Sequence, residues 1–193
     1  MEEGNREGKA KLLLHVCCGP CSTEVIHRLS EEHELILFFY NPNISPVGEH
    51  DRRLDEAKRY ASAHGIRFTR GGYDHDAWLG AVKGLEGEPE GGRRCGACFA
   101  YRLEAAARKA VEEGAALFST TLTVSPHKNA ASVNAAGEEA GRKCSVAFFA
   151  ADFKKKDGFL KSCHRASEAG MYRQDYCGCE FSRRPPGTAR ARD

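Results

Sequence analysis

The sequence lacks an apolar run long enough to cross a membrane. Its longest apolar runs, over 35–39 and 146–151, contain five and six residues, whereas a membrane-spanning helix needs about 20. A signal peptide is missing too, because residues 1–9 are polar and partly acidic. We therefore expect a cytoplasmic protein without a membrane partner.

An excess of one charge sign is also absent. The 193 residues include 29 Lys and Arg against 27 Asp and Glu, a formal net charge of +2. The distribution says more than the total, because positive charge is concentrated in the C-terminal quarter. A lysine run is ordinarily a solvated face, but the whole concentration is what binding to a nucleic-acid backbone requires. Its members are Lys154, Lys155, Lys156, Arg173, Arg183, Arg184, Arg190 and Arg192.

No internal repeat is visible, and short apolar strands alternate with helices along the chain. We expect strands over 12–16, 34–40, 66–68, 115–124 and 145–151. We expect helices over 22–33, 49–64, 74–85, 99–113, 129–142 and 159–169. This order predicts an α/β fold, a parallel sheet with helices on both faces, whose ligands bind at the carboxyl ends of the strands.

The predicted elements divide the chain into three parts. Residues 1–10 are expected to be a flexible N-terminus, and residues 11–182 a single α/β catalytic domain. Residues 183–193, rich in arginine and proline, are expected to be a basic disordered tail.

Cysteine is unusually abundant for such a protein. There are nine cysteines, an odd number that argues against a fully paired disulfide framework. Structural disulfides are rare in the cytosol, so clustered cysteines there more often bind metal or perform redox chemistry.

The chain is organised around the turn that follows the first strand. Gly19-Pro20 ends the strand, and Ser22 or Thr23 is predicted to cap the next helix. Such a strand–helix junction leaves a crevice lined by backbone N–H groups. Cysteines fill the turn where nucleotide-binding proteins carry glycines, which indicates a site for a group that binds sulfur.

Four thiols on two loops suggest a metal site. Cys17 and Cys18 with Cys95-x-x-Cys98 have the number of ligands that a [4Fe–4S] cluster needs. A four-cysteine zinc site that fixes the 86–94 loop is equally compatible with the spacing. The Cys95–Cys98 pair alone, at a helix start, could instead be a thioredoxin-type redox pair, which the glycine-rich loop before it makes less favourable. Cys21 is a minor candidate ligand.

A second cysteine pair lies near the C-terminus. A disulfide between Cys177 and Cys179 would be a tight, strained ring that Gly178 permits. Strained disulfides are easily reduced, as an electron relay requires. We favour this interpretation over two metal ligands or two unpaired thiols. Cys144 and Cys163 are predicted to be inert.

Three further residues are candidates of lower rank. His15 lies on the first strand and is predicted to be a buried, hydrogen-bonded histidine. His127 and Lys128 precede a helix, where they could meet a phosphate or a polar substrate, or equally be a solvated helix start.

Five motifs, in order from residue 12 to about 182, resemble the cobalamin-independent epoxyqueuosine reductases, the QueH family. They are Leu-Leu-His-Val-Cys-Cys-Gly-Pro-Cys at 13–21, Phe-Tyr-Asn-Pro-Asn-Ile at 39–44, Arg-Cys-Gly-Ala-Cys-Phe at 94–99, Thr-Thr-Leu-Thr-Val-Ser-Pro-His-Lys-Asn at 120–129 and Tyr-Arg-Gln-Asp-Tyr-Cys-Gly-Cys at 172–179.

The resemblance implies the last step of queuosine biosynthesis, reduction of epoxyqueuosine to queuosine at the wobble position of tRNA. It implies that Cys17, Cys18, Cys95 and Cys98 hold an iron–sulfur cluster, with an additional iron left open. It also implies that Cys177 and Cys179 form a redox-active disulfide. The partners would be tRNA carrying epoxyqueuosine and an unidentified electron donor.

The implied fold resembles the nucleotide-binding (HUP or PP-loop-like) group that includes tRNA-thiolating enzymes. The central turn lacks their Ser-Gly-Gly-x-Asp-Ser loop, so ATP is not expected. Epoxide deoxygenation consumes two electrons, which zinc cannot supply. Two other interpretations stay open: a zinc-stabilised protein that binds or modifies tRNA, and a thiol–disulfide oxidoreductase acting on proteins.

Overall fold

The computed structural model describes residues 8–183. The predicted flexible N-terminus over 1–10 and the predicted basic tail over 183–193 therefore lie almost wholly outside the described residues. Where the two overlap, Ala10 already belongs to the first strand. None of the helices found between residues 8 and 183 is both long and apolar enough to cross a membrane.

The core is a parallel sheet of five strands with the order β3-β2-β1-β4-β5. The strands are β1 (Ala10–Val16), β2 (His33–Phe39), β3 (Arg67–Arg70), β4 (Leu117–Thr120) and β5 (Ala147–Phe148). The helices are α1 (Gly19–Ser30), α2 (Val47–Ala63), α3 (His75–Ala81), α4 (Arg93–Glu112), α5 (Ala130–Cys144) and α6 (Gly158–Glu168). Two 3₁₀ turns, η1 (Thr121–Val124) and η2 (Glu180–Ser182), complete the described fold.

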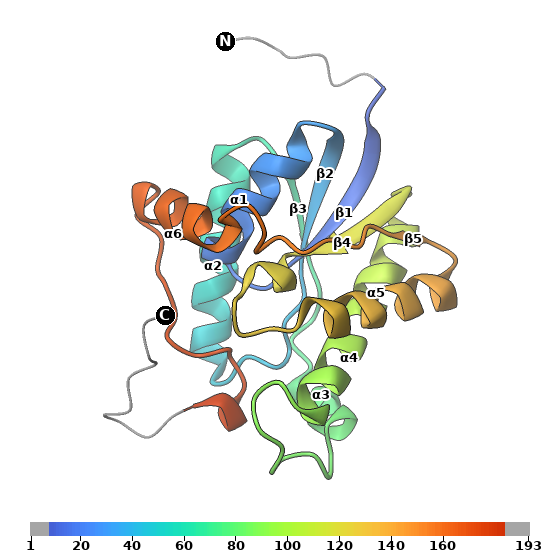
Figure 1. Cartoon of the computed structure of the whole chain (residues 1–193), viewed down its shortest axis with the longest axis vertical. Helices are drawn as coiled ribbons and strands as arrows, with labels where there is room; N and C mark the ends of the chain where they lie inside the picture. The colour runs from blue at the N-terminus through green and yellow to red at the C-terminus, as the bar shows by residue number, and fades with distance from the viewer. Residues whose placement is uncertain (1–7, 184–193) are drawn as a thin grey trace.

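Apolar side chains alternate along β1 and so bury both faces of the sheet. Leu12, Leu14 and Val16 pack with α1, α2 and α6, whereas Leu13 packs with α4 and α5. Figure 1 shows the two groups of helices on opposite sides of the strands. Each fully buried side chain of this kind stabilises the fold by about 1.5–3 kcal/mol. The prediction of a parallel sheet covered on both faces is confirmed.

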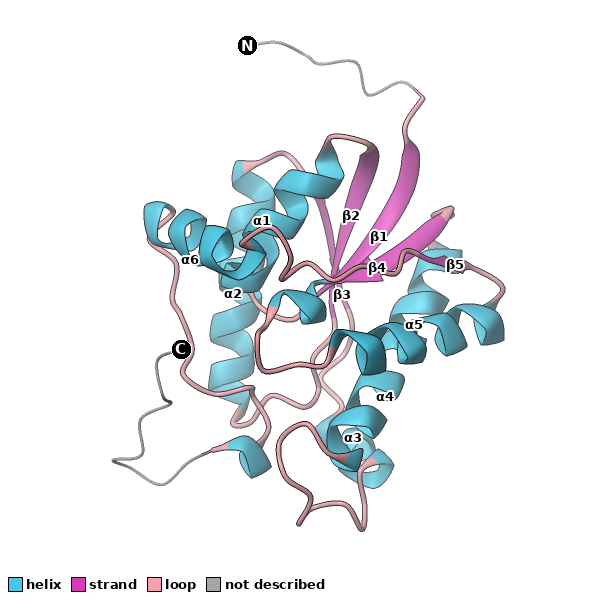
Figure 2. Ribbon diagram, viewed as in Figure 1, coloured by secondary structure: helices cyan, strands magenta, loops and turns pink. Residues whose placement is uncertain are grey.

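The strand order changes direction at β1, because successive strands are added first on one side of β1 and then on the other. From β1 the chain first builds β2 and β3 on one side, and it later returns to place β4 on the other. A topological switch point of this kind leaves a crevice at the carboxyl ends of the two strands. Figure 2 shows the strands converging there, with the loops beyond them. Cys17 follows β1 and Thr121 follows β4, so both lie at the crevice.

Two predicted element boundaries are wrong near this crevice. The strand predicted over 115–124 ends at Thr120, whose hydroxyl accepts a hydrogen bond from the Leu122 backbone N–H and starts η1. The helix predicted from residue 22 begins at Gly19, because proline is tolerated in the first turn of a helix. Ser22 and Thr23 therefore cannot cap it: their hydroxyls donate to backbone carbonyl oxygens within the helix.

A third boundary matters for the cysteines. The helix predicted from residue 99 begins at Arg93. Cys95 and Cys98 thus lie in the first two turns of α4, not at the end of the loop over 86–94. A one-turn helical spacing directs both side chains toward the same side of α4.

Candidate metal and redox site

A cavity of about 560 Å³ opens at the carboxyl end of β1. Its lining comes from the turn after β1, from the loop after β2, from helices α1, α2, α4 and α6, from the segment before α5 and from the chain that follows α6. The chemically active side chains in that lining include Cys17, Cys18, Cys21, Lys128, Gln174 and Cys177. Residues from distant parts of the sequence therefore meet at the switch point.

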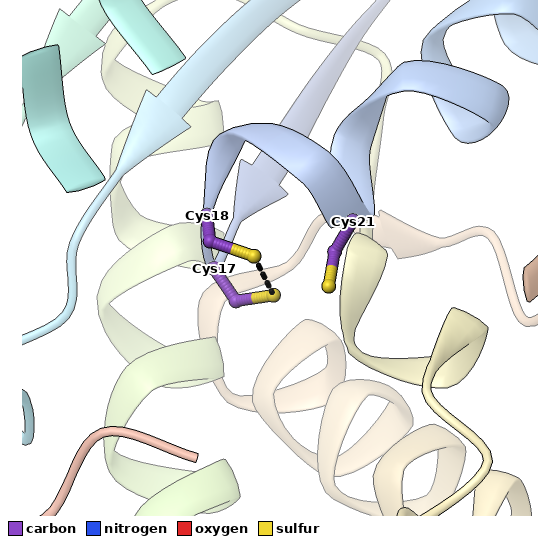
Figure 3. Close-up of side chains that lie close together, drawn as sticks. All are labelled: Cys17, Cys18 and Cys21. Carbon is purple, nitrogen blue, oxygen red and sulfur yellow. Dashed lines mark hydrogen bonds between the residues drawn. The ribbon is translucent and has the colours of Figure 1, made fainter. Parts of the chain in front are cut away.

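Three thiols form the tightest cluster at this cavity. The sulfurs of Cys17, Cys18 and Cys21 all lie within 4.8 Å of one another, and those of Cys17 and Cys18 are 3.9 Å apart (Figure 3). Within residues 8–183 no other group of three or more His, Cys, Asp or Glu side chains is gathered as closely for a metal ion. Cys21, a minor candidate from the sequence, is thus a full member of this cluster.

The start of α1 holds the three thiols together. Cys18 is the N-cap residue and has an extended backbone, and Cys21 follows one turn later. The Thr121 hydroxyl accepts from the Cys17 backbone N–H at 3.1 Å and lies 3.4 Å from the Cys17 sulfur. The spacing Cys18-x-x-Cys21 was the sequence signal for this arrangement, since it places two thiols in the first turn of a helix.

Cys95 and Cys98 lie next to the cavity but outside the three-thiol cluster. Cys95 accepts a hydrogen bond from the Gly91 N–H at 3.2 Å. It lines a smaller pocket of about 60 Å³, whose lining also includes Lys128 and Cys177. Cys98 is buried and lies 3.9 Å from an Arg102 nitrogen. The structure therefore places the CxxC pair beside the same cavity without bringing its sulfurs together with the other three.

The segment that carries Cys177 and Cys179 folds back against the same region. All nine cysteines lie within the described residues and are free thiols. Cys177 lines both pockets, whereas Cys179 is buried with Cys98 and Trp78. Gly178 between them has φ +138°, a conformation that glycine alone adopts readily. The redox role of the pair stays a prediction.

The comparisons with known proteins point to one family. The family described as "Epoxyqueuosine reductase QueH" matches residues 12–185. Epoxyqueuosine reductase QueH of Streptococcus pyogenes is 37% identical over 185 residues, covering 93% of this chain and 72% of that protein. The Acinetobacter baylyi protein is 40% identical over 176 residues, covering 90% and 81%. The chain belongs to the QueH family. The resemblance seen in the five motifs is therefore confirmed.

Solved structures with the same fold are more distant from this QueH chain. The U34-tRNA thiolase NcsA of Methanococcus maripaludis, solved with its [4Fe-4S] cluster, has a TM-score of 0.58 at 14% identity, covering 94% of this chain and 64% of that one. A predicted subunit of a tRNA methyltransferase from Methanocaldococcus jannaschii has a TM-score of 0.57 at 14% identity, covering 82% and 75%. At this identity the likeness shows the fold alone.

The three clustered thiols of this QueH protein differ in acidity. Hydrogen bonds from the Cys18 and Cys21 thiols hold the pKa of Cys17 well below its ordinary value, and the cations of Lys128 and Arg102 act in the same direction. The same hydrogen bonding to Cys17 raises the pKa of Cys18, to about 12, and that of Cys21. Cys17 is therefore the first of the three to become a thiolate, the form that binds metal.

The outlying thiols keep their protons more firmly. Burial raises the pKa of Cys95, Cys98 and Cys179.

Lys128 lies beside the cavity and has a raised pKa. Burial lowers the pKa of Lys128, but the nearby sulfurs of Cys177, Cys17 and Cys21 outweigh burial and raise it above the ordinary value. Lys128 thus stays an ammonium ion beside the cavity, which favours the substrate-contact interpretation over a solvated helix start.

His15 has the structural role predicted from the sequence. It is fully buried, and its ring nitrogens lie 2.8 Å from the Thr120 hydroxyl and 3.2 Å from the Tyr40 carbonyl oxygen. Burial, assisted by Arg102, lowers its pKa to about 3. The neutral ring therefore donates from Nε2 to Tyr40 and accepts from Thr120 at Nδ1. His15 fixes the ends of β1 and β4 relative to each other.

Three residues of the site were not identified from the sequence. Gln174 donates from its side-chain nitrogen to the Cys18 sulfur at 3.0 Å. Arg53 is buried and donates to the carbonyl oxygens of Tyr176 and Cys177 at 3.3 and 3.0 Å. Arg102 lies beside Cys98. Gln174 and Arg53 act across more than one hundred residues of sequence, so only the fold brings them to the thiols, whereas Arg102 follows Cys98 by one turn of α4.

The other two cysteines have different surroundings. Cys144 is the last residue of α5 and packs, half-buried, against the core between the sheet and α4 and α5. Cys163 lies in α6 and contributes to the lining of the large cavity. The prediction that Cys163 is inert stays a prediction.

Proposed function

We propose that this QueH chain reduces epoxyqueuosine to queuosine at the wobble position of tRNA. The observation that carries the proposal is the thiol cluster at the switch point of a chain that matches the epoxyqueuosine reductase family over residues 12–185. Removing the epoxide oxygen as water consumes two electrons and two protons, so the site must contain a reductant. Thiols and sulfur-bound metal are suited to that role.

The proposed cofactor is a [4Fe–4S] cluster held by Cys17, Cys18, Cys95 and Cys98. The fit is chemical: Cys17 and Cys18 line the large cavity, Cys95 lines the smaller pocket beside it and Cys98 follows one turn later in α4, so the four thiols match the usual number of cluster ligands. When bound, such a cluster supplies single electrons and an electrophilic iron. Cys21 adds a further thiol beside the first two, which would be available to an additional iron.

The proposed source of the electron pair is the dithiol of Cys177 and Cys179. Its oxidation to a disulfide releases two electrons and two protons, which balance the conversion of the epoxide to an alkene and water. An external reductant must then reduce the disulfide before another turnover. Cys177 lines the cavity, whereas Cys179 is buried with Cys98 and Trp78.

Lys128 is proposed to hold the epoxide oxygen. Its ammonium group lies at the cavity near the sulfurs of Cys17, Cys21 and Cys177, and none of the ion pairs within the described part of the chain involves it. A raised pKa keeps it charged, so it stabilises the negative charge that develops on the oxygen as its bond to carbon breaks. A tRNA substrate also implies work in the cytoplasm.

The test is conversion of epoxyqueuosine in purified tRNA. The chain, purified without oxygen and reduced chemically, should yield queuosine in single turnover, measured by mass spectrometry of the digested nucleosides. The Cys17→Ser variant should yield none. An iron-loaded wild-type chain that binds the tRNA but leaves the epoxide intact would contradict the proposal. Stoichiometric zinc, or reduction of protein disulfides with tRNA irrelevant, would favour the two other interpretations.

A further inference from the structure

Arg102 is a buried cation without a carboxylate partner. It lies in α4 and is 2% exposed. Its guanidinium nitrogens donate to the Asn41 side-chain oxygen and toward the Cys98 sulfur, and its Nε has no partner. None of the ion pairs formed among residues 8–183 includes Arg102.

The two other deeply buried arginines are satisfied differently. Arg53 pairs with the Glu49 carboxylate at 2.6 Å. Arg94, also 2% exposed and also in α4, donates to the carbonyl oxygens of Glu86 and Glu88 in the loop that precedes the helix. Arg53 therefore has a carboxylate partner and Arg94 has loop carbonyl oxygens, although the Arg94 Nε also has no hydrogen-bond partner. Arg102 alone among the three faces a neutral amide and a thiol.

A buried cation is stabilised when an anionic group lies beside it, and Arg102 has no carboxylate that could provide one. The groups that can do so are the thiols. An Arg102 nitrogen lies 3.9 Å from the Cys98 sulfur, and Arg102 lines the same cavity as Cys17 and Cys18. It is thus close to thiols from α4 and from the turn after β1.

Asn41 fixes the guanidinium in this position. Its side-chain nitrogen donates to the Val16 carbonyl oxygen, the last of β1, at 2.9 Å, and its side-chain oxygen accepts from Arg102. Asn41 is fully buried. The charge of Arg102 is therefore held at the end of the strand that leads into Cys17, independently of any metal.

We propose that Arg102 is a positioning residue that supplies the counter-charge for a net anionic, thiolate-bound iron–sulfur cluster and raises its reduction potential. This inference rests on the proposed cofactor. A cluster with four thiolates is negatively charged and gains one more negative charge on reduction. A nearby cation stabilises the reduced form more than the oxidised form, because electrostatic interactions are strong where water is excluded.

The test compares three variants of the full chain. Arg102→Met removes the charge while retaining similar length, and Arg102→Lys keeps the charge. Arg108→Met is the matched control, since Arg108 lies on the same helix, 62% exposed, and pairs with Glu104 on the surface. The readouts are the midpoint potential of the cluster, iron retained against a chelator, and the Tm of the metal-free protein.

The account predicts that Arg102→Met shifts the midpoint potential to more negative values and loses iron several-fold faster. Its metal-free Tm should be unchanged or higher, because an uncompensated buried charge has been removed. Arg102→Lys should lie close to the wild type in potential, and Arg108→Met should match the wild type in all three readouts. Complete loss of the cluster in Arg102→Met, with the metal-free Tm intact, would also support the proposal.

A wild-type potential in Arg102→Met, with a lower metal-free Tm, would show that Arg102 serves only to hold Asn41 and the strand end. Equal potential shifts in Arg102→Met and Arg102→Lys would show that shape and not charge matters. Either result would overturn the role proposed for Arg102 and would leave the proposed cofactor standing. Absence of iron and sulfide from the wild-type chain would instead overturn the proposed cofactor, and the two failures are thereby distinguished.

Discussion

Cys177 and Cys179 have different environments although only Gly178 separates them. Cys177 faces the cavity, and Cys179 packs with Trp78 and Cys98. The glycine is held by a hydrogen bond from the Ser45 N–H to its carbonyl oxygen at 2.9 Å. A side-chain carbon at position 178 would lie 3.0 Å from Ile44 and 3.3 Å from Arg53. The fold thus fixes the pair at one place and leaves one thiol accessible.

Replacing Cys179 with serine should separate the relay from the ligand interpretation. If the pair is a relay, the Cys179→Ser protein should keep its iron and its affinity for tRNA, because neither sulfur is needed for the sheet or the cluster. Multiple turnover should fail, while a chemically reduced cluster should still support part of one turnover. The measurements are the iron content per chain and the yield of queuosine under single-turnover and multiple-turnover conditions.

Cys144→Ser is the matched control, because Cys144 is half-buried at the far end of α5 and lies outside the cavity lining. It should retain both iron and multiple turnover. Loss of iron in Cys179→Ser, in proportion to activity, would make Cys179 a ligand. Normal multiple turnover by Cys179→Ser with a thiol-free electron donor would end the relay hypothesis.

At the scale of single residues, the sequence indicated that Cys17, Cys95 and Cys177 lie near the site but not how the cysteines group, and Cys163, which was predicted to be inert, also lines the cavity. The Cys17-Cys18 pair was evident from its place after a buried strand. Cys21 was underrated because helix α1 was expected to begin after it; beginning at Gly19, it turns Cys21 back toward the other two. Gln174 could not be predicted, since hydrogen bonding to a sulfur leaves no periodic pattern in a sequence. Arg102 lies four residues after Cys98, and this helical spacing was missed because the helix was expected to begin after Cys98.

At the scale of elements, the three lysines of the run over 154–156 differ in their contacts and in their exposure to solvent. Lys154 donates to the carbonyl oxygens of Lys128 and Thr123, at 3.1 and 3.4 Å, and pairs with Asp152. Lys155 and Lys156 are exposed, and only their backbone carbonyl oxygens accept hydrogen bonds from Arg28. The first lysine therefore ties the chain before α6 to the chain before α5, and the other two are available to a partner.

Separate substitutions should reveal this division. Lys154→Ala should lower the free energy of unfolding by about 1–2 kcal/mol, because it removes charge-assisted hydrogen bonds. The double variant Lys155→Ala/Lys156→Ala should keep the wild-type Tm and weaken tRNA binding. The slope of the logarithm of its tRNA-binding constant against the logarithm of salt concentration should become shallower by about 0.7–0.9 for each lost phosphate contact. Undiminished tRNA affinity in the double variant would exclude this surface.

The order and type of the elements followed from hydrophobic patterning, whereas several boundaries did not. Helices α1 and α4 both begin earlier than predicted, since Gly19-Pro20 and Gly92 are compatible with helix starts as well as with loops. The strand after residue 115 ends at Thr120, because the Thr120 hydroxyl accepts a hydrogen bond from the Leu122 N–H and so stabilises a turn in place of a longer strand. Such local hydrogen bonds decide boundaries that periodicity leaves open.

At the scale of the whole molecule, the parallel sheet brings the separate motifs to one edge. β1 and β4 end side by side in the register Leu14 to Ser119 and His15 to Thr120, and the segment after α6 returns across that edge (Figure 1). The sequence could predict the meeting place, because the carboxyl ends of parallel strands share one edge. It could not predict how far apart the sulfurs lie, which depends on tertiary packing.

The central claim is that the thiols at this edge hold a redox-active iron–sulfur cluster, and metal analysis of anaerobically purified chain tests it most directly. We predict about four irons and four acid-labile sulfides per chain, with a brown colour that the Cys95→Ser or Cys98→Ser variant loses together with activity. Stoichiometric zinc in place of iron, or full iron content in both of those variants, would contradict the account.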